Sequence, residues 1–469
     1  MTKRTVTALL AAVLGLAAAP AAGCQAAKPA SAASRPSVSG PLTGGRMTTA
    51  APIPLPGYTE REYVMRGTAA SYVYTGTPQP DGRWNVGVAG HASYATRLVV
   101  RRPADPRRFN GTVVVEWLDL PPGQGGIDLD PDFLTERAEL LRSGYAWVGV
   151  SAQQQGVQTL KSRDPGRYGA LSHPGDDYSY DIYAQVAAVL RHPGGTDPLR
   201  GLRPRRLIAD GYSGSSRRLT TFYDAIQPLA RPYDAFLIHG RGATSAPLAQ
   251  GRPSPATVAV RIDASAPVLT VQTETELVPA PPDFPKLDYL PAAQPDSRNF
   301  RLWEVPGTSH VDKDLATQLA RETTGREPTA CAKPPNDGQG RYVMDAALAH
   351  LDLWVRTGTP APTAPRIEQK DAQPVRDSDG NVRGGLRTPA LQAPTATLTG
   401  DGNSGANPQC ELEGVTTPWP GSRLKARYPD HDAYVAAVRR AVRDAQAAGH
   451  LLPADAAEIL ASAKAADLP

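Results

Sequence analysis

The sequence has few cysteines, little net charge and no long apolar segment. Three cysteines occur among 469 residues, and neither a Cys-x-x-Cys pair nor a histidine cluster indicates a zinc site or another metal site. The net charge of +4 is too small to predict a nucleic-acid partner. The apolar run from Val6 to Ala19 is too short to span a bilayer. Without internal repeats, this length fits one enlarged α/β domain or two to three smaller domains.

The N-terminal residues have the pattern of an export signal. Lys3 and Arg4 precede the apolar run, which is followed by a segment of small residues, AAGC, that ends at Cys24. We therefore expect residues 1–23 to be a signal peptide. The AAGC segment resembles a lipobox, in which Cys24 becomes the lipidated first residue and the only attachment to a membrane. The alternative is cleavage before Ser34 without a lipid.

The two other cysteines, Cys331 and Cys410, form an even pair in a chain expected to meet an oxidising compartment. We predict that they are joined, and closing so long a loop would stabilise the fold by up to about 4 kcal/mol. Two buried, unpaired thiols are the alternative.

The segment 207–226 has the pattern of a strand, a sharp turn and a helix. An apolar run leads into Gly-Tyr-Ser-Gly-Ser, and apolar residues then recur at helical spacing. A serine at such a turn exposes its hydroxyl beside the amides of a helix start. Ser213 is therefore the candidate nucleophile, and the amide of Gly214 is a candidate oxyanion donor. The alternative is an ordinary Ser/Gly-rich loop, since Ser215 stands where this motif usually has a second glycine.

The order of predicted elements indicates the fold class. Residues 24–56 are rich in Ala, Pro and Ser and are predicted to be a flexible tether. Strands then alternate with helices, which predicts a mostly parallel sheet with helices on both faces, over residues 57–469. Short separate strands are expected between Tyr63 and Arg101. From about residue 330 onward we expect a cap-like and helical segment that packs near the site.

Polar residues follow several of the predicted strands. A buried strand ends near Leu118 and Asp119, and the backbone amide of either residue is a candidate second oxyanion donor. Glu274 and Glu276 follow the strand at 267–272. If the strand continues, its side chains alternate and both glutamates point to the same side, so either of them is a candidate acid. His310 follows the strand at 300–305. The order serine, acid, histidine is that of the α/β-hydrolases.

A group of acidic residues after the buried strand that ends near Leu118 has the approximate spacing of a calcium loop. Phe133 occupies the position where such a loop needs glycine, so calcium is the weaker interpretation. We expect instead a helix that is capped by Asp130, starts with Pro131 and runs to Arg142. The acidic residues concerned are Asp128, Asp130, Asp132 and Glu139.

Motifs in this order resemble those of a bacterial α/β-hydrolase-domain family whose members are often exported: VVVEWL, GYAWVGVSAQ, YGALSHPGDDYSYDIYAQ, GYSGS, PVLTVQTETEL, LWEVPGTSH and GGLRTPALQAPTATLTG. The resemblance extends from about Tyr58 to the C-terminus. It implies an α/β-hydrolase fold in which Ser213 is the nucleophile, His310 the base and a carboxylate of the TETEL segment the acid. The sequence departs from the family at three positions, with Gly214 in place of glutamine, Asp119 in place of asparagine and Glu276 in place of aspartate.

These observations predict an exported serine hydrolase that needs no cofactor. A carboxylic ester is the expected substrate because it is the common substrate of this fold. The alternative is a surface lipoprotein that binds a small ligand in the same cleft without turnover. The oligomeric state is not indicated by the sequence.

Overall fold

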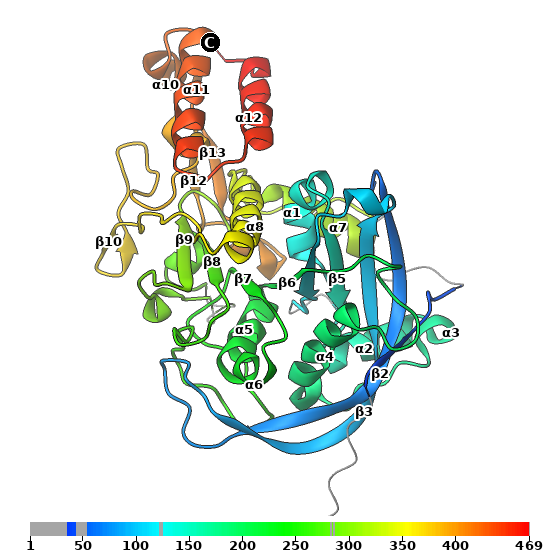
Figure 1. The fold of residues 1–469 in the computed structure, drawn as a ribbon. Helices are drawn as coiled ribbons and strands as arrows, with labels where there is room; N and C mark the ends of the chain where they lie inside the picture. The colour runs from blue at the N-terminus through cyan, green and yellow to red at the C-terminus, as the bar shows by residue number, and fades with distance from the viewer. Residues whose placement is uncertain (1–34, 44–53, 122–124, 282–283, 285–286, 469) are drawn as a thin grey trace, which may run out of the picture. The chain divides into compact units, whose positions relative to one another are not determined.

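The computed structural model describes residues 35–43, 54–121, 125–281, 284 and 287–468. These residues form a nine-stranded sheet in the order β1-β2-β3-β5-β4-β6-β7-β8-β9 (Figure 1). The first three strands pair antiparallel, as do β3 and β5, whereas the strands from β5 to β9 in this order pair parallel. The strands are β1 (Ser37–Ser39), β2 (Tyr58–Tyr74), β3 (Val86–Pro103), β4 (Thr112–Trp117), β5 (Ala146–Val150), β6 (Arg206–Tyr212), β7 (Ala235–His239), β8 (Val268–Thr273) and β9 (Phe300–Val305).

Helices cover both faces of this sheet, as predicted. Apolar side chains of α4 and α5 pack in one cluster, and those of α1, α7 and α8 pack in a second cluster on the other face (Figure 1). Short helices connect these elements. The helices of this part are α1 (Pro131–Arg142), α2 (Gln154–Arg163), α3 (Pro165–Tyr168), α4 (Ser179–Arg191), α5 (Ser213–Thr221), α6 (Gln227–Ala230), α7 (Lys313–Thr324) and α8 (Gly340–Thr357), with short or irregular helices η1 (Pro106–Arg108), η2 (Asp176–Tyr178), η3 (Phe222–Ile226), η4 (Thr275–Leu277) and η5 (Leu290–Ala292).

Strand β4 illustrates why the sheet forms in this way. Val113 and Val115 pack in the cluster with α4 and α5, while Val114 between them packs in the cluster with α1 and α8. Successive side chains of a strand point to opposite faces, so a strand covered on both faces must be apolar throughout. The run of valines thus places β4 in the centre of the sheet, where its carboxyl end lies beside that of β6.

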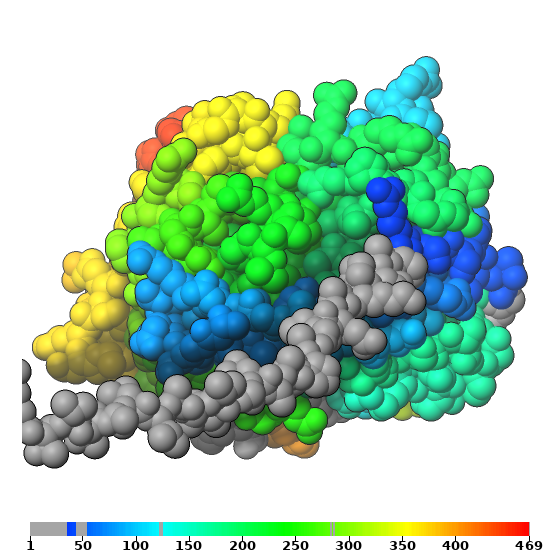
Figure 2. Space-filling model, turned by 60° about the horizontal axis from the view of Figure 1, so that its bottom comes forward, coloured from blue at the N-terminus to red at the C-terminus, as the bar shows by residue number. Residues whose placement is uncertain are grey.

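The antiparallel end of the sheet differs from the prediction. Instead of several short strands, β2 and β3 are 17 and 18 residues long and pair along their whole length. The small residues in the middle of each strand have little strand propensity of their own, and backbone hydrogen bonds to the partner strand hold them in the extended conformation. The turn between them reaches the segment near residue 260, where Ala259 N donates to Pro80 O at 2.8 Å. Figure 2 shows this face, with the hairpin in blue against green segments.

Part of the predicted tether is ordered. Ser37–Ser39 form the edge strand β1, which pairs antiparallel with β2 in the register Val38 to Met65. Val38 is buried, and its amide donates to Gly194 O at 2.8 Å. Composition did not reveal this strand because backbone hydrogen bonds and one apolar side chain are sufficient to hold it.

Helix α1 has the predicted bounds but a different cap. Asp130 precedes the helix, yet its carboxylate pairs with Arg101 instead of with helix amides. The helix start is capped from the sheet, since the Glu116 carboxylate accepts hydrogen bonds from Asp132 N at 3.1 Å and Phe133 N at 2.9 Å. Each of the four acidic residues with calcium-like spacing contacts a different basic side chain. The pairs are Asp128 with Arg97, Asp130 with Arg101, Asp132 with His239 and Glu139 with Arg142.

The C-terminal region is elaborated, as predicted. The structure joins Cys331 and Cys410 in a disulfide. Helices α11 and α12 pack on each other in a separate apolar cluster (Figure 1). None of the helices in the described ranges has the length and apolar character required to cross a membrane. The elements of this region are β10 (Gln369–Lys370), β11 (Gln373–Pro374), α9 (Pro389–Gln392), β12 (Ala396–Thr399), η6 (Pro408–Leu412), β13 (Val415–Pro418), α10 (Gly421–Arg427), α11 (His431–Ala447) and α12 (Pro453–Ala465).

Candidate active site

Ser213 lies at the sharp turn between β6 and α5. Its backbone has φ 55°, in the left-handed region that non-glycine residues rarely adopt. The turn is held by Ser215, whose hydroxyl donates to Tyr212 O at 2.7 Å and accepts from Tyr212 N at 3.1 Å. Serine in the place of the second glycine therefore closes the turn with its own hydrogen bonds. Strained backbone of this kind is common at functional sites because the surrounding fold must maintain it.

A chain of two hydrogen bonds connects Ser213 to a buried carboxylate. His310 Nε2 lies 3.0 Å from Ser213 Oγ, and His310 Nδ1 lies 2.6 Å from Glu276 Oε1. The three residues come from the carboxyl ends of β6, β8 and β9, which meet at one edge of the sheet. His310 and Glu276 are buried, whereas Ser213 is partly exposed. The arrangement has the order hydroxyl, imidazole, carboxylate that general-base activation of a nucleophile requires.

Three neighbours fix the orientation of the imidazole and the carboxylate. Glu276 Oε2 accepts from Thr273 N at 2.7 Å and Thr273 Oγ1 at 2.8 Å. The backbone amide of His310 donates to Thr275 Oγ1 at 2.9 Å. The Tyr212 ring stacks on the imidazole, with centroids 4.6 Å apart, and its hydroxyl donates to His310 O. The imidazole therefore has little freedom to rotate away from Ser213.

Glycine at position 240 allows the His310 ring to approach the sheet. Gly240 follows β7 with φ +62°, and a Cβ atom there would lie 3.0 Å from His310 Cε1. Because that distance is tighter than ordinary packing, any side chain at this position would displace the imidazole.

Glu274, the other candidate acid, faces a different part of the fold. Its Oε2 accepts from Gly307 N at 2.8 Å, and its Oε1 forms an ion pair with Arg376 at 2.9 Å. The chain leaves the strand after Thr273 and continues into the short helix η4, so the two glutamates do not keep the period of two of a strand. Glu274 supports the loop that carries His310 but does not contact the imidazole.

The two amides predicted to complete an oxyanion hole are already used. Leu118 N donates to Val150 O at 3.3 Å, and Asp119 N donates to Leu129 O at 2.9 Å. This corrects the prediction that one of them is available, because long-range backbone pairing extends beyond β4. Gly214 lies in the first turn of α5, and its amide remains the predicted oxyanion donor.

The side chain of Asp119, in contrast, lies at the site. Its Oδ1 accepts from Ser215 N at 3.0 Å. A Cβ atom at position 214 would lie only 2.9 Å from this oxygen, so two departures from the family pattern, Asp119 and Gly214, are in contact. Burial raises the pKa of Asp119 to about 6, although the Ser215 amide and His310 oppose that shift.

The Ser213 hydroxyl opens into a cavity of about 590 Å³. One wall is apolar and comes mainly from α7, through Ala316, Leu319 and Ala320. The other wall comes from η6 and the residues after it, including Leu412 and Glu413, which the disulfide holds. Residues of the C-terminal segment therefore line the same cavity as Ser213. A cavity of this size accommodates a small organic molecule.

A group of buried carboxyls lies behind the site, between α1 and the sheet. The His239 ring packs at a tilt of 57° against Tyr212, and its Nδ1 lies 2.7 Å from Asp132 Oδ1. Burial lowers the pKa of His239 to about 4 and raises the pKa of Asp132 to about 8, so both shifts favour the neutral forms of the two side chains. Burial also raises the pKa values of three further carboxyls, those of Glu116, Glu136 and Asp210.

Several functional side chains were not found from the sequence. Thr273 and Thr275 belong to the TETEL motif, so their place beside the acid was a usable signal. The stacking of Tyr212 on His310 and the use of the Asp119 carboxylate depend on contacts between distant segments, for which the sequence carries no local signal.

Cys24 and the predicted signal peptide lie outside the described residues.

The alpha/beta hydrolase domain family matches residues 26–461 of the chain. No curated protein matches the sequence. Among solved structures, a candidate dienelactone hydrolase from Klebsiella pneumoniae is 12% identical, with 63% of this chain and 99% of that chain covered and a TM-score of 0.32. An esterase from Rhizomucor miehei is 12% identical, with coverage of 66% and 87% and a TM-score of 0.29. A serine hydrolase without lid from Xanthomonas campestris is 13% identical, with coverage of 50% and 91% and a TM-score of 0.26. Because the family match spans nearly all of the sequence, the chain belongs to the alpha/beta hydrolase domain family.

Proposed function

We propose that the protein is a serine hydrolase that cleaves carboxylic esters of small molecules through an acyl-enzyme. The observation that supports this is the hydrogen-bond chain from Ser213 Oγ to His310 Nε2, at 3.0 Å, and from His310 Nδ1 to Glu276, at 2.6 Å, at the wall of a cavity. The strained turn at Ser213 and the family match give independent support.

In the proposed mechanism His310 removes the Ser213 proton as the hydroxyl oxygen attacks the ester carbonyl. The Glu276 carboxylate keeps the proton of neutral His310 on Nδ1 and stabilises the imidazolium that forms. The tetrahedral intermediate then collapses, and the imidazolium donates its proton to the departing alcohol. Water, activated by the same imidazole, releases the acid from Ser213.

The amide of Gly214 is the donor that we assign to the oxyanion in this mechanism. It lies at the N-terminal turn of α5, where helix amides and the helix dipole favour negative charge. The second donor is left unassigned, because Leu118 N and Asp119 N donate elsewhere.

A fluorophosphonate probe together with a panel of p-nitrophenyl esters tests this proposal. We expect covalent labelling at Ser213 and release of p-nitrophenol, with both lost in Ser213→Ala at an unchanged melting temperature. A folded protein that is not labelled and turns over no ester would contradict the proposal and favour a ligand-binding role for the same cavity.

Export and lipid attachment at Cys24 are proposed from the sequence pattern alone. Mass spectrometry of the N-terminal peptide, after separation of membranes from culture fluid, checks both. We expect cleavage before Cys24 and a diacylglyceryl mass on that residue. An unmodified N-terminus within residues 25–34 would instead indicate ordinary secretion.

A further inference from the structure

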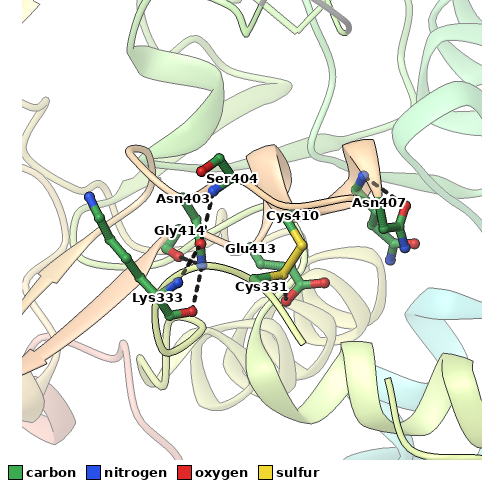
Figure 3. The surroundings of a disulfide bond; sticks show 9 residues. Cys331, Lys333, Asn403, Ser404, Asn407, Cys410, Glu413 and Gly414 are labelled. Carbon is green, nitrogen blue, oxygen red and sulfur yellow. Dashed lines mark hydrogen bonds between the residues drawn. A yellow bond between two sulfur atoms is a disulfide. The ribbon is translucent and has the colours of Figure 1, made fainter. Parts of the chain in front are cut away.

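Glu413 is a buried carboxyl in the wall of the cavity that contains Ser213. It is 3% exposed and lies among the residues that line the cavity. Its Oε2 lies 3.2 Å from Cys331 Sγ, and Figure 3 shows the carboxylate beside the disulfide. The sulfur is bonded to Cys410 and carries no proton, so this contact supplies neither a hydrogen bond nor a countercharge.

Glu413 forms no ion pair with any residue that the structure describes. Burial raises the pKa of its carboxyl to about 7, and no cation opposes that shift. A buried charge is ordinarily paired because removing it from water is costly. A carboxyl held in a cavity wall without a partner is therefore suited to bind a cation supplied by a ligand.

The backbone keeps Glu413 close to the reacting groups. Val311 N donates to Leu412 O at 3.0 Å, so the residue after His310 is bonded to the residue before Glu413. The disulfide anchors Cys410, which precedes Glu413 in the same segment, and Asn336 N donates to Glu413 O at 2.8 Å. The carboxyl thus has a fixed position relative to the imidazole.

The charges around the cavity all have the same sign. Asp119, Glu327 and Glu413 line it, whereas no lysine or arginine of the described ranges does. Glu327 is exposed and paired with Arg321, so it contributes little at the rim. An anionic substrate would enter the cavity without a cationic partner and close to acidic groups, which disfavours its binding.

We propose that the cavity selects esters that carry a cationic group away from the scissile bond, with Glu413 as the residue that recognises it. This proposal rests on the proposed function, because it concerns the substrate of the same site. Esters with an apolar body and a quaternary ammonium group fit the apolar wall from α7 and the buried Glu413 carboxylate opposite it. Esters of dicarboxylic acids with a free carboxylate are rejected.

Two series of matched esters test the proposal, since either arm of the ester can carry the charge. In the first, p-nitrophenyl 4-(trimethylammonio)butanoate is compared with p-nitrophenyl 5,5-dimethylhexanoate, its neutral isostere, and with p-nitrophenyl hydrogen adipate. In the second, acetylcholine is compared with 3,3-dimethylbutyl acetate, its neutral isostere. We expect kcat/KM for the cationic ester to exceed that of its neutral isostere by at least tenfold in one of the two series. In the first series, kcat/KM for the anionic ester should be at least tenfold lower than that of the neutral isostere.

The variant Glu413→Gln keeps the size of the side chain and removes its charge. It should reduce the cationic preference to about threefold or less while kcat/KM for the neutral ester changes less than threefold. Glu327→Gln, which removes an exposed charge from the same cavity, should keep the full preference. A ratio near one in both series, or a ratio that Glu413→Gln leaves unchanged, overturns the proposal.

A binding measurement separates failure of this proposal from failure of the proposed function. Calorimetry on Ser213→Ala should give at least tenfold tighter binding of a cationic ester than of its neutral isostere, and the double variant Ser213→Ala with Glu413→Gln should lose this difference. If no ester is turned over but the cationic ester still binds more tightly than its neutral isostere, only the proposed function is contradicted. Equal binding of both esters would overturn the proposal whether or not turnover occurs.

Discussion

The substitution Glu276→Gln gives a sharp test of the assigned acid, because the hydrogen bonds around it fix the outcome. Glu276 Oε2 accepts two hydrogen bonds from Thr273, one from the backbone amide and one from the hydroxyl. The backbone amide can only donate, so the carbonyl oxygen of a glutamine must occupy the position of Oε2. The NH₂ group is then directed at His310 Nδ1, where Oε1 stands in the wild type at 2.6 Å.

An NH₂ group at this position reverses the tautomer of the imidazole. It can only donate, so Nδ1 must become the acceptor and the proton of neutral His310 must move to Nε2. Nε2 would then present a proton to Ser213 Oγ at 3.0 Å and be unable to accept one. In a serine protease the same change of tautomer lowers kcat by roughly 10⁴, which corresponds to about 5 kcal/mol in the activation barrier. We expect a loss of this size with little change in KM.

The assay is p-nitrophenolate release under saturating substrate, with Glu274→Gln as the matched control. Glu274 is equally buried and two residues away, but it pairs with Gly307 N and Arg376. Its substitution should change kcat less than threefold and lower the melting temperature. The ¹⁵N shifts of His310 in histidine-labelled protein report the tautomer directly. A Glu276→Gln enzyme within tenfold of the wild type, or an equal loss in Glu274→Gln, would refute the assignment.

Three further predictions concern stability. Replacing both Cys331 and Cys410 by serine should lower the free energy of unfolding by about 4 kcal/mol, since the disulfide closes a loop with a sequence separation of 79; urea melts with and without reductant check this, and equal midpoints would contradict it. Asp119→Asn should stabilise the protein by about 3 kcal/mol at pH 8 and hardly at pH 4, because the pKa of this buried carboxyl is raised from 3.8 to about 6 and its ionisation in the folded state is unfavourable; an equal effect at both pH values would refute it. Burial likewise raises the pKa of Glu136 well above its ordinary value, so its neutral form stabilises the fold below pH 4.5 and this contribution is lost as the pH rises. Melting temperatures from pH 5 to 9 should therefore decline in the wild type and decline less in Glu136→Gln, and parallel curves would count against the argument.

The elements that the sequence predicted well are those with local signals at both ends. Helix α1 starts at Pro131 and ends before Gly144, which has φ +76°, and the predicted bounds are those observed. Strand β9 also has the predicted bounds, because an apolar run ends there at Pro306. Ser213 and His310 were identifiable for the same reason, since each follows a strand at a turn that contains glycine.

The features that the sequence did not predict depend on register between distant segments. Whether Leu118 N and Asp119 N are available is decided by Val150 and Leu129, whose positions opposite β4 no local pattern specifies. The choice between Glu274 and Glu276 depends on where β8 ends, and the sequence allowed the strand to continue. Edge strand β1 is likewise held by a partner, β2, more than by its own composition.

The C-terminal region acts as a support for the site as well as a wall of the cavity. Thr275 Oγ1, which accepts from His310 N, donates in turn to Gly400 O at 2.6 Å. Val311 N, one residue after His310, donates to Leu412 O at 3.0 Å. The histidine loop is therefore held on both sides by the C-terminal segment, at Gly400 within the loop that the disulfide closes and at Leu412 just after Cys410. Because proton transfer between His310 and Ser213 depends on a separation near 3 Å, loosening this segment should lower kcat under conditions where the core of the sheet is still folded. The C-terminal region thus belongs to the active site in an energetic sense, although none of its residues is assigned a chemical step.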